Sequence, residues 1–198
     1  DRKEACSKLS SALDAFVIKG VSTNIPFVNS VLTNKKFLSG NITTAFLEEE
    51  YPKGYSGLLK SKEKVLLISL ASLAMKAIEI NRESKLNKGN YVVIISKHHF
   101  KLKYEIISND VNNIYKIKVG YNSKLYEIVV SWNIGEPILQ ISLDNTESIM
   151  QVSKALSRYN ICHAGFDIQS KVIELEIFNL AKMIPKKPKN ISTKMLIS

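Results

Sequence analysis

Cysteine is scarce in this 198-residue sequence. The chain contains two cysteines, Cys6 and Cys162, which are far apart and outside any paired spacing. This scarcity excludes a small secreted domain held together by disulfides, and it excludes a zinc site built from cysteines. The hydrophobic share of 45% and the charged share of 23% are ordinary for a globular chain, so we expect most of it to fold.

Arginine is also scarce, although the chain is basic. The formal net charge is +10, but only Arg2, Arg82 and Arg158 among the 28 basic residues are arginines. Proteins that read nucleic acids rely on the planar guanidinium group with its five donors. Five lysines lie in the tail from Lys182 to Lys194, which contains no acidic residue. We therefore expect no nucleic-acid partner.

No apolar run is long enough to predict a membrane span. The most apolar stretch, Val65 to Ile80, has about 16 residues and includes Lys76 and Glu79, whereas a bilayer needs roughly 20. The sequence begins at Asp1, and no basic segment followed by an apolar one resembles a signal peptide. We expect no membrane partner and predict a soluble piece of a larger protein.

The first 50 residues predict short helices with a strand between them. Apolar and small residues recur at helical spacing from Glu4 to Phe16. Residues 16–21 predict a short strand, and Asn24 can cap a following helix that has Pro26 in its first turn.

Residues 62–83 predict one long helix that is apolar on nearly every side, with Ser61 as its N-cap. A helix of this kind must be buried all round. The region 91–179 instead alternates between apolar and polar residues, with turn signals about every 10 residues, which predicts antiparallel strands with one solvated face. The eight predicted strands are 91–97, 99–107, 112–119, 123–131, 137–143, 146–154, 158–164 and 167–179.

The helix needs an apolar lining, and the strands offer one. The predicted fold is therefore α+β, with a long central helix surrounded by an eight-stranded antiparallel β-barrel. Eight strands ordinarily enclose only side chains, so strong strand tilt or a partial opening is expected. Residues 182–198 contain two prolines and five lysines and predict a linker.

Sequence motifs for catalysis are absent. The eight glycines form neither a G-x-G-x-x-G pattern nor a G-K-[ST] pattern. Cys162 and His163 are adjacent in a predicted strand and should point to opposite faces, so we expect a buried cysteine and an outward histidine rather than a catalytic pair. Trp132 is expected to pack. We predict no catalytic, cofactor-binding or metal-binding residue in this chain.

Several motifs resemble a known family. Residues 12–27 (ALDAFVIKGVSTNIPF) and 37–47 (FLSGNITTAFL) are similar to the end of a biotin carboxylase domain. Residues 51–57 (YPKGYSG), 131–133 (SWN) and 137–139 (PIL) narrow the resemblance to the alpha chains of biotin-dependent acyl-CoA carboxylases, and among these to the propionyl-CoA carboxylases. The resemblance covers nearly the whole chain.

The resemblance implies a division of the chain and a docking role. Residues 1–50 would be the C-terminal end of the biotin carboxylase domain, 51–181 a bridging domain, and 182–198 a linker towards a biotinyl domain. The bridging domain would comprise a central helix 62–83, a hook 82–90 and a β-barrel 91–179. The hook would bind the carboxyltransferase beta subunit, and its residues are Arg82, Glu83, Ser84, Lys85, Leu86, Asn87, Lys88, Gly89 and Asn90.

The family also implies chemistry for the parent protein. It would use ATP, Mg and covalently attached biotin, held by residues outside this sequence, and its other partners would be the biotin carboxylase and biotinyl domains of the same chain. The expected location is the bacterial cytoplasm, with the mitochondrial matrix as the alternative.

Two other function classes share some of these features. A hot-dog-fold acyl-CoA thioesterase or dehydratase also wraps antiparallel strands around a long helix, but it normally places a strand before that helix. A basic β-barrel that binds nucleic acid would need aromatic residues on an exposed strand face. In this sequence Phe100, Tyr104 and Tyr115 lie on the apolar faces.

Overall fold

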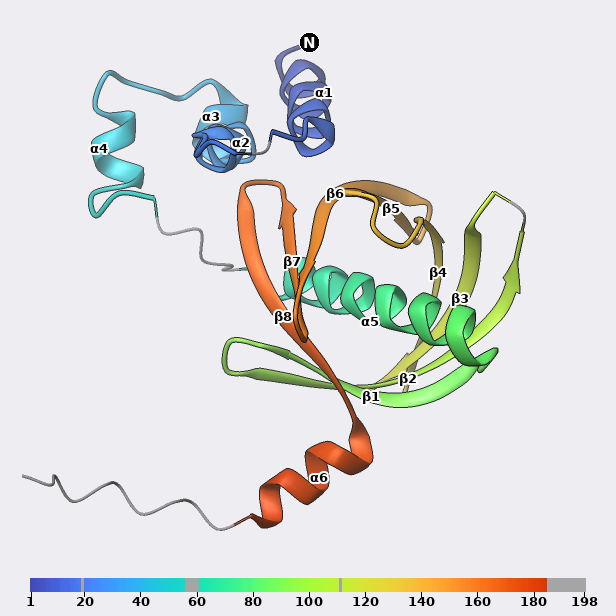
Figure 1. The fold of residues 1–198 in the computed structure, drawn as a ribbon. Helices are drawn as coiled ribbons and strands as arrows, with labels where there is room; N and C mark the ends of the chain where they lie inside the picture. Colours follow the sequence, from blue (N-terminus) through green and yellow to red (C-terminus); the bar gives the residue numbers. More distant parts are fainter. Residues whose placement is uncertain (19, 56–60, 111, 185–198) are drawn as a thin grey trace, which may run out of the picture.

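The computed structural model describes residues 1–18, 20–55, 61–110 and 112–184. Figure 1 shows a group of short helices, then a β-barrel around a long helix, then a final helix that leaves the barrel. The predicted α+β architecture is confirmed.

Eight antiparallel strands pair in sequence order, and β1 also pairs with β8, so the barrel is closed. The strands are β1 (Lys88–Ile95), β2 (His98–Asn109), β3 (Ile114–Tyr121), β4 (Lys124–Ser131), β5 (Ile138–Leu143), β6 (Thr146–Ala155), β7 (Arg158–His163) and β8 (Phe166–Glu174). Three hairpins turn through residue pairs with positive φ, Asn122-Ser123, Asp144-Asn145 and Ala164-Gly165. Such turns match the right-handed twist of the strands, which helps the sheet to curl.

The long helix α5 (Lys62–Ser84) runs through this barrel. Ser61 caps it, because its hydroxyl accepts a hydrogen bond from the backbone N–H of Lys64. Leu70 and Leu73 have no exposed surface, and burial of each side chain stabilises the fold by about 1.5–3 kcal/mol. The predicted central helix is confirmed.

Small residues explain how eight strands enclose a helix. Ala71, Ala74 and Ala77 are fully buried, as is Ser72. Their short side chains let the strands approach the helix axis, so the closed barrel needs no partial opening. The Ser72 hydroxyl also donates to the Ile68 carbonyl oxygen at 2.8 Å, which satisfies this polar group inside the core.

The N-terminal region folds into α1 (Arg2–Ala15), α2 (Ile25–Leu32), α3 (Lys35–Ser39) and α4 (Phe46–Glu50). The prediction of a strand over residues 16–21 is wrong. Its described residues, 16–18 and 20–21, pair with no strand, and Phe16 and Val21 are 62% and 68% exposed. A strand is stable only when a neighbour pairs with its backbone, and no neighbour is present among the described residues.

The last predicted strand is too long at its C-terminal end. Strand β8 ends at Glu174, and helix α6 (Leu175–Met183) follows it, so the helix also covers the first residues of the predicted linker. Pairing explains the change. Strand β7 accompanies β8 only to Lys171, and β1 accompanies it only to Glu174. Beyond that point the backbone satisfies its hydrogen bonds as a helix, and Phe178 supplies a buried anchor.

Among the helices of the described residues, none combines the length and the apolar character that crossing a bilayer requires.

Candidate docking interface

The loop between α5 and β1 is shorter than the predicted hook, residues 82–90. The first three hook residues are the last turn of α5, and Lys88, Gly89 and Asn90 already belong to β1. The connection itself consists of residues 85–87. Lys85 adopts a left-handed conformation with φ of 58° and donates its N–H to the Asn81 carbonyl oxygen, which ends the helix.

Hydrogen bonds hold the hook in one shape. The Asn81 side-chain amide donates to Asn87 Oδ1 at 2.6 Å, and the Asn87 carbonyl oxygen accepts from the backbone N–H of Ile106 at 2.7 Å. Its β1 residues also pair with β2. Strand β1 begins at Lys88, earlier than the predicted first strand, so the last three hook residues belong to the sheet. Leu86 remains 56% exposed, as an apolar side chain on a preformed turn.

Gly89 of the hook lies within β1 and pairs with Tyr104. A Cβ atom at this position would lie 2.7 Å from Cε2 of Tyr91 and 3.0 Å from Cε1 of Tyr104. Glycine is needed because the two tyrosine rings cover its backbone.

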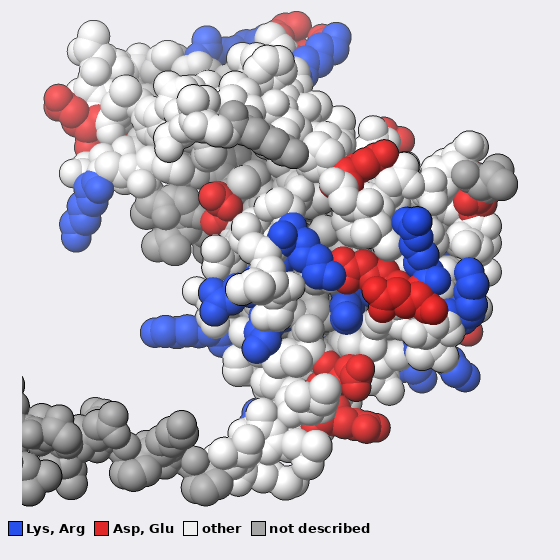
Figure 2. Space-filling model, in the orientation of Figure 1, with Lys and Arg blue, Asp and Glu red and all other residues white. Residues whose placement is uncertain are grey.

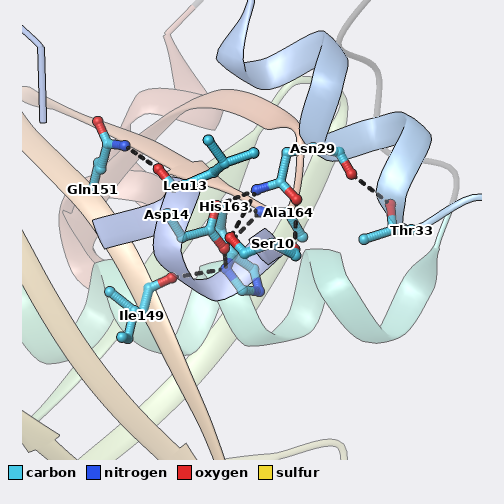
Figure 3. Close-up of polar contacts among 9 residues, drawn as sticks. All are labelled: Ser10, Leu13, Asp14, Asn29, Thr33, Ile149, Gln151, His163 and Ala164. Atoms are coloured by element: carbon cyan, nitrogen blue, oxygen red, sulfur yellow. Dashed lines mark hydrogen bonds and ion pairs between the residues drawn. The ribbon is translucent and has the colours of Figure 1, made fainter. Parts of the chain in front are cut away.

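A second interface joins the N-terminal helices to the barrel. Figure 3 shows Asp14 of α1 pointing at the end of β7, together with Asn29 of α2. The Asp14 carboxylate is buried, at 6% exposure. It accepts hydrogen bonds from the Ala164 backbone N–H at 2.9 and 3.0 Å and from Asn29 Nδ2 at 2.7 Å, and its Oδ2 lies 2.8 Å from His163 Nδ1. Partners on three segments thus compensate for burial of the charge.

Further polar contacts extend this helix–barrel seam, which we define as the contacts of α1 and α2 with β6 and with the β7–β8 turn. Asn29 is 1% exposed and accepts a short hydrogen bond from the Ser10 hydroxyl. From β6, the side-chain amide of Gln151 donates to the carbonyl oxygens of Leu13 (3.1 Å) and Phe16 (3.3 Å). These polar groups of the helices and of the barrel therefore have hydrogen-bond partners at the seam.

The β7–β8 turn fits closely against α2. Gly165 has a φ of +83°, and a Cβ atom added there would lie 2.5 Å from the Ser30 backbone nitrogen and 2.7 Å from the Pro26 carbonyl oxygen. These distances leave no room for a side chain. The sequence must place glycine at this position for the helix backbone to rest on the turn.

The sequence prediction for Cys162 and His163 is only partly matched. The histidine turns towards Asp14 rather than outward, and its Nδ1 also lies 2.9 Å from the Ile149 carbonyl oxygen. Cys162 is half-buried, and burial together with Asp167 raises the pKa of its thiol to about 12. Trp132 packs as predicted, at 4% exposure.

Sequence reasoning missed Asp14 altogether. An acidic residue on a short helix usually faces solvent, and its main-chain partner Ala164 lies 150 residues away. Across the described ranges of the chain, no three histidine, cysteine or acidic side chains are grouped so that they could hold a metal ion.

Two family models match the chain. Residues 1–49 match the biotin carboxylase C-terminal domain, and residues 76–187 match the propionyl-coenzyme A carboxylase BT domain. Neither is a thioesterase or a nucleic-acid-binding family, so the comparisons support neither alternative function. The order of the two matches agrees with the order of the helical segment and the barrel.

Individual relatives agree with the family models. The chain is 29% identical over 160 residues to the mitochondrial propionyl-CoA carboxylase alpha chain of Rattus norvegicus. This alignment covers 76% of this chain and 21% of the relative. It is 24% identical over 206 residues to the propionyl-CoA carboxylase alpha chain of Ruegeria pomeroyi, covering 99% of this chain and 30% of the relative. A shorter match, 47% identical over 49 residues, is to the mitochondrial pyruvate carboxylase of Mus musculus and covers 25% of this chain and 4% of that protein.

The chain thus spans about a fifth of the length of the first of these propionyl-CoA carboxylase alpha chains and just under a third of the second. The resemblance seen in the sequence motifs is confirmed, since the BT-domain model covers more than half of the chain and coincides with the end of α5 and the whole barrel. The barrel, its central helix and these matches together establish that the chain belongs to the propionyl-coenzyme A carboxylase BT domain family.

Proposed function

We propose that this chain is the non-catalytic bridging part of the alpha subunit of a biotin-dependent carboxylase that acts on propionyl-CoA. Its role is to attach the biotin carboxylase domain to a carboxyltransferase beta subunit. The substrate is the acyl-CoA that the names of the relatives carry. A scaffold that holds two active sites in one particle raises the effective concentration of the intermediate that passes between them.

The helix–barrel seam is the observation that carries this proposal. The segment that matches a biotin carboxylase domain is bonded to the barrel that matches a BT domain through the buried Asp14 carboxylate. Removing one partner of a buried charge is costly, so the two parts are held in a defined orientation. A bridging domain that is rigidly attached to the biotin carboxylase segment can hold that domain in a fixed position.

We assign the docking surface for the beta subunit to the hook. The middle of α5 is buried and cannot touch another protein, whereas Leu86 is exposed where the helix leaves the barrel. The outward face of β3 carries Lys116 and Lys118, and interfaces are poor in lysine. A preformed turn also loses little entropy when it binds.

ATP, Mg and biotin belong to other parts of the alpha chain in this proposal. The described residues offer no three-residue group of metal-binding side chains, and the sequence has no glycine-rich phosphate loop. Their chemistry would be the ATP-driven carboxylation of biotin, followed by transfer of the carboxyl group to the acyl-CoA. The parent would work in the bacterial cytoplasm or the mitochondrial matrix.

The test is assembly of the full-length alpha chain with its beta subunit, measured by size-exclusion chromatography and by titration calorimetry. Leu86→Asp should weaken assembly, because it places a charge in an apolar contact. The matched control Lys116→Glu with Lys118→Glu alters the barrel wall and should leave assembly nearly unchanged. Unchanged assembly of the Leu86 variant would remove the hook from the interface, and no assembly of the wild type would overturn the docking role itself.

A further inference from the structure

A cavity of about 370 Å³ opens beside the hook, at the end of the barrel where α5 emerges. Its walls come from the last turns of α5, the β4–β5 loop and the end of β6. The lining residues that matter here are Glu79, Glu83, Trp132, Glu136 and Lys154, and we call this space the mouth cavity. Figure 2 shows acidic side chains gathered over the middle of the barrel, flanked by basic ones.

Glu79 is a buried carboxylate at the wall of this cavity, with 4% exposure. Its Oε2 accepts hydrogen bonds from Lys154 Nζ and from the Tyr159 hydroxyl, both at 2.8 Å. Its Oε1 is also buried, yet it has no hydrogen-bond partner among the described residues. A buried carboxylate oxygen without a donor is costly, so this atom is satisfied only when a further donor enters.

The mouth cavity is also short of positive charge. Glu79 and Glu83 are four residues apart on α5 and therefore share one face of the helix. Glu79, Glu83 and Glu136 line the cavity, and Lys154, which pairs with Glu79, is the single basic residue among its described lining residues. In a chain of net charge +10, such a concentration of acids is unusual. Burial, followed by the negative charges of Glu79 and Glu83, raises the pKa of Tyr159.

We propose that the mouth cavity receives an arginine side chain of the carboxyltransferase subunit as an anchor beside the hook. The guanidinium group donates to Glu79 and Glu83 together, because its planar fork suits two neighbouring carboxylates. The exposed Lys154 ammonium moves aside to admit it. This inference rests on the proposed docking function and specifies its chemistry.

Continuity with the hook supports this occupant. Glu83 belongs both to the hook and to the cavity wall. A partner that contacts Leu86 can therefore also reach the cavity, because the two sites form one continuous surface. Arginine is enriched among the residues that dominate binding energy, and these residues tend to fill pockets close to the centre of an interface. The buried indole of Trp132 provides an apolar wall, and its Nε1–H is already bonded to the Glu136 carbonyl oxygen at 3.0 Å.

The first experiment measures the affinity of the full-length alpha chain for the beta subunit by titration calorimetry. We expect Glu83→Gln to weaken binding about fivefold and Glu79→Gln about tenfold or more, since each removes a charge-assisted hydrogen bond. The control Glu127→Gln changes an exposed carboxylate on β4 that pairs with Lys118, and it should alter affinity less than twofold. Thermal melting checks that Glu79→Gln folds, while Glu83 is exposed and should be replaced without structural cost.

The second experiment tests the cavity without the partner. Trp132 is the only tryptophan of the chain, so its indole resonance and its fluorescence report on the cavity. Titration of this chain with N-acetyl-L-argininamide should shift both signals, and the neutral N-acetyl-L-glutaminamide should not. Glu83→Gln should weaken the response to the arginine derivative by several fold.

The outcomes separate the two proposals. If the beta subunit binds but Glu83→Gln and Glu79→Gln act no more strongly than Glu127→Gln, the arginine anchor is wrong and docking stands. If the arginine derivative shifts Trp132 but the beta subunit does not bind, the cavity is a guanidinium site and the docking function is wrong. No response to the arginine derivative, combined with unaltered affinity in the variants, overturns the anchor completely.

Discussion

The hydroxyl oxygens of Ser72 and Ser170 lie 2.7 Å apart inside the barrel, although 98 residues separate them in the chain. Ser72 is on α5 and Ser170 is on β8, so this hydrogen bond ties the central helix to the barrel wall. A hydrophobic core alone permits a helix to slide or turn, because apolar contacts are not directional. The serine pair therefore helps to fix the rotation of α5, and with it the direction in which Glu79 and Glu83 face.

Burial of the central helix predicts a large effect of Leu70→Asp. Leu70 has no exposed surface, so the new carboxylate would be buried without a partner, and we expect the free energy of unfolding to fall by about 3–5 kcal/mol. The same change at Leu125, which is 65% exposed on β4, is the control and should cost less than about 1 kcal/mol. Urea unfolding measures both. Similar midpoints for the two variants would contradict the enclosed helix.

The Asp14 carboxylate predicts a local effect at the helix–barrel seam. Asp14→Asn removes the buried negative charge. With Oδ1 kept for the Ala164 N–H and the Asn29 amide, the new amide group replaces Oδ2, which now accepts the second Ala164 contact and lies 2.8 Å from His163 Nδ1. We expect a loss of about 2–4 kcal/mol, confined to the seam. Hydrogen exchange should become faster in residues 2–32 and stay unchanged in β3 and β4. Glu48→Ala, at an exposed site on α4, is the control, and equal exchange in both variants would argue against the seam.

Gly165 allows the close approach of α2 to be tested separately from backbone strain. Gly165→Ala introduces a Cβ atom that clashes with the α2 backbone and also strains a residue with φ of +83°. Gly135→Ala introduces similar strain, at φ of +95°, but has no atom within 4 Å of the new Cβ. We expect Gly165→Ala to lower the free energy of unfolding by about 2 kcal/mol more than Gly135→Ala. Urea unfolding of the two variants should show this difference, and equal losses would mean that the contact with α2 is loose.

The raised pKa of Cys162 predicts an unreactive thiol. Burial and Asp167 raise this pKa from 9.0 to about 12, so the thiolate fraction at pH 8 falls on the order of a thousandfold. In a Cys6→Ala background, alkylation by iodoacetamide should be slower by a similar factor than in urea-unfolded protein. Because the folded state holds this proton more tightly, the stabilisation is complete below about pH 9 and declines as the pH rises towards 12. Equal labelling of folded and unfolded protein at pH 8 would refute the burial of this thiol.

Much of the barrel could be predicted from the sequence, because its features repeat locally. The alternation of Phe100, Leu102 and Tyr104 places each side chain on the inner face of β2, and all three are buried. The apolar circumference of residues 62–83 required burial on all sides, and only a wall of strands could supply it. The family resemblance came from the same local information, since motifs such as residues 51–57 are read along the chain.

The ends of elements and both interaction sites were decided by the tertiary structure. Residues 16–21 have strand character, but the described ones, 16–18 and 20–21, pair with no described strand. Residues 175–179 alternate like a strand but lie beyond the reach of β1 and β7. Asp14, Glu79 and Gly165 look like ordinary surface or turn residues in the sequence. Their roles arise from partners brought close by folding, namely Ala164 for Asp14, Tyr159 for Glu79 and Pro26 for Gly165. Periodicity along the chain shows which face of a helix or strand is apolar. The partner of a buried charge is determined only when distant segments come together, because a hydrogen bond depends on the distance and direction between its atoms.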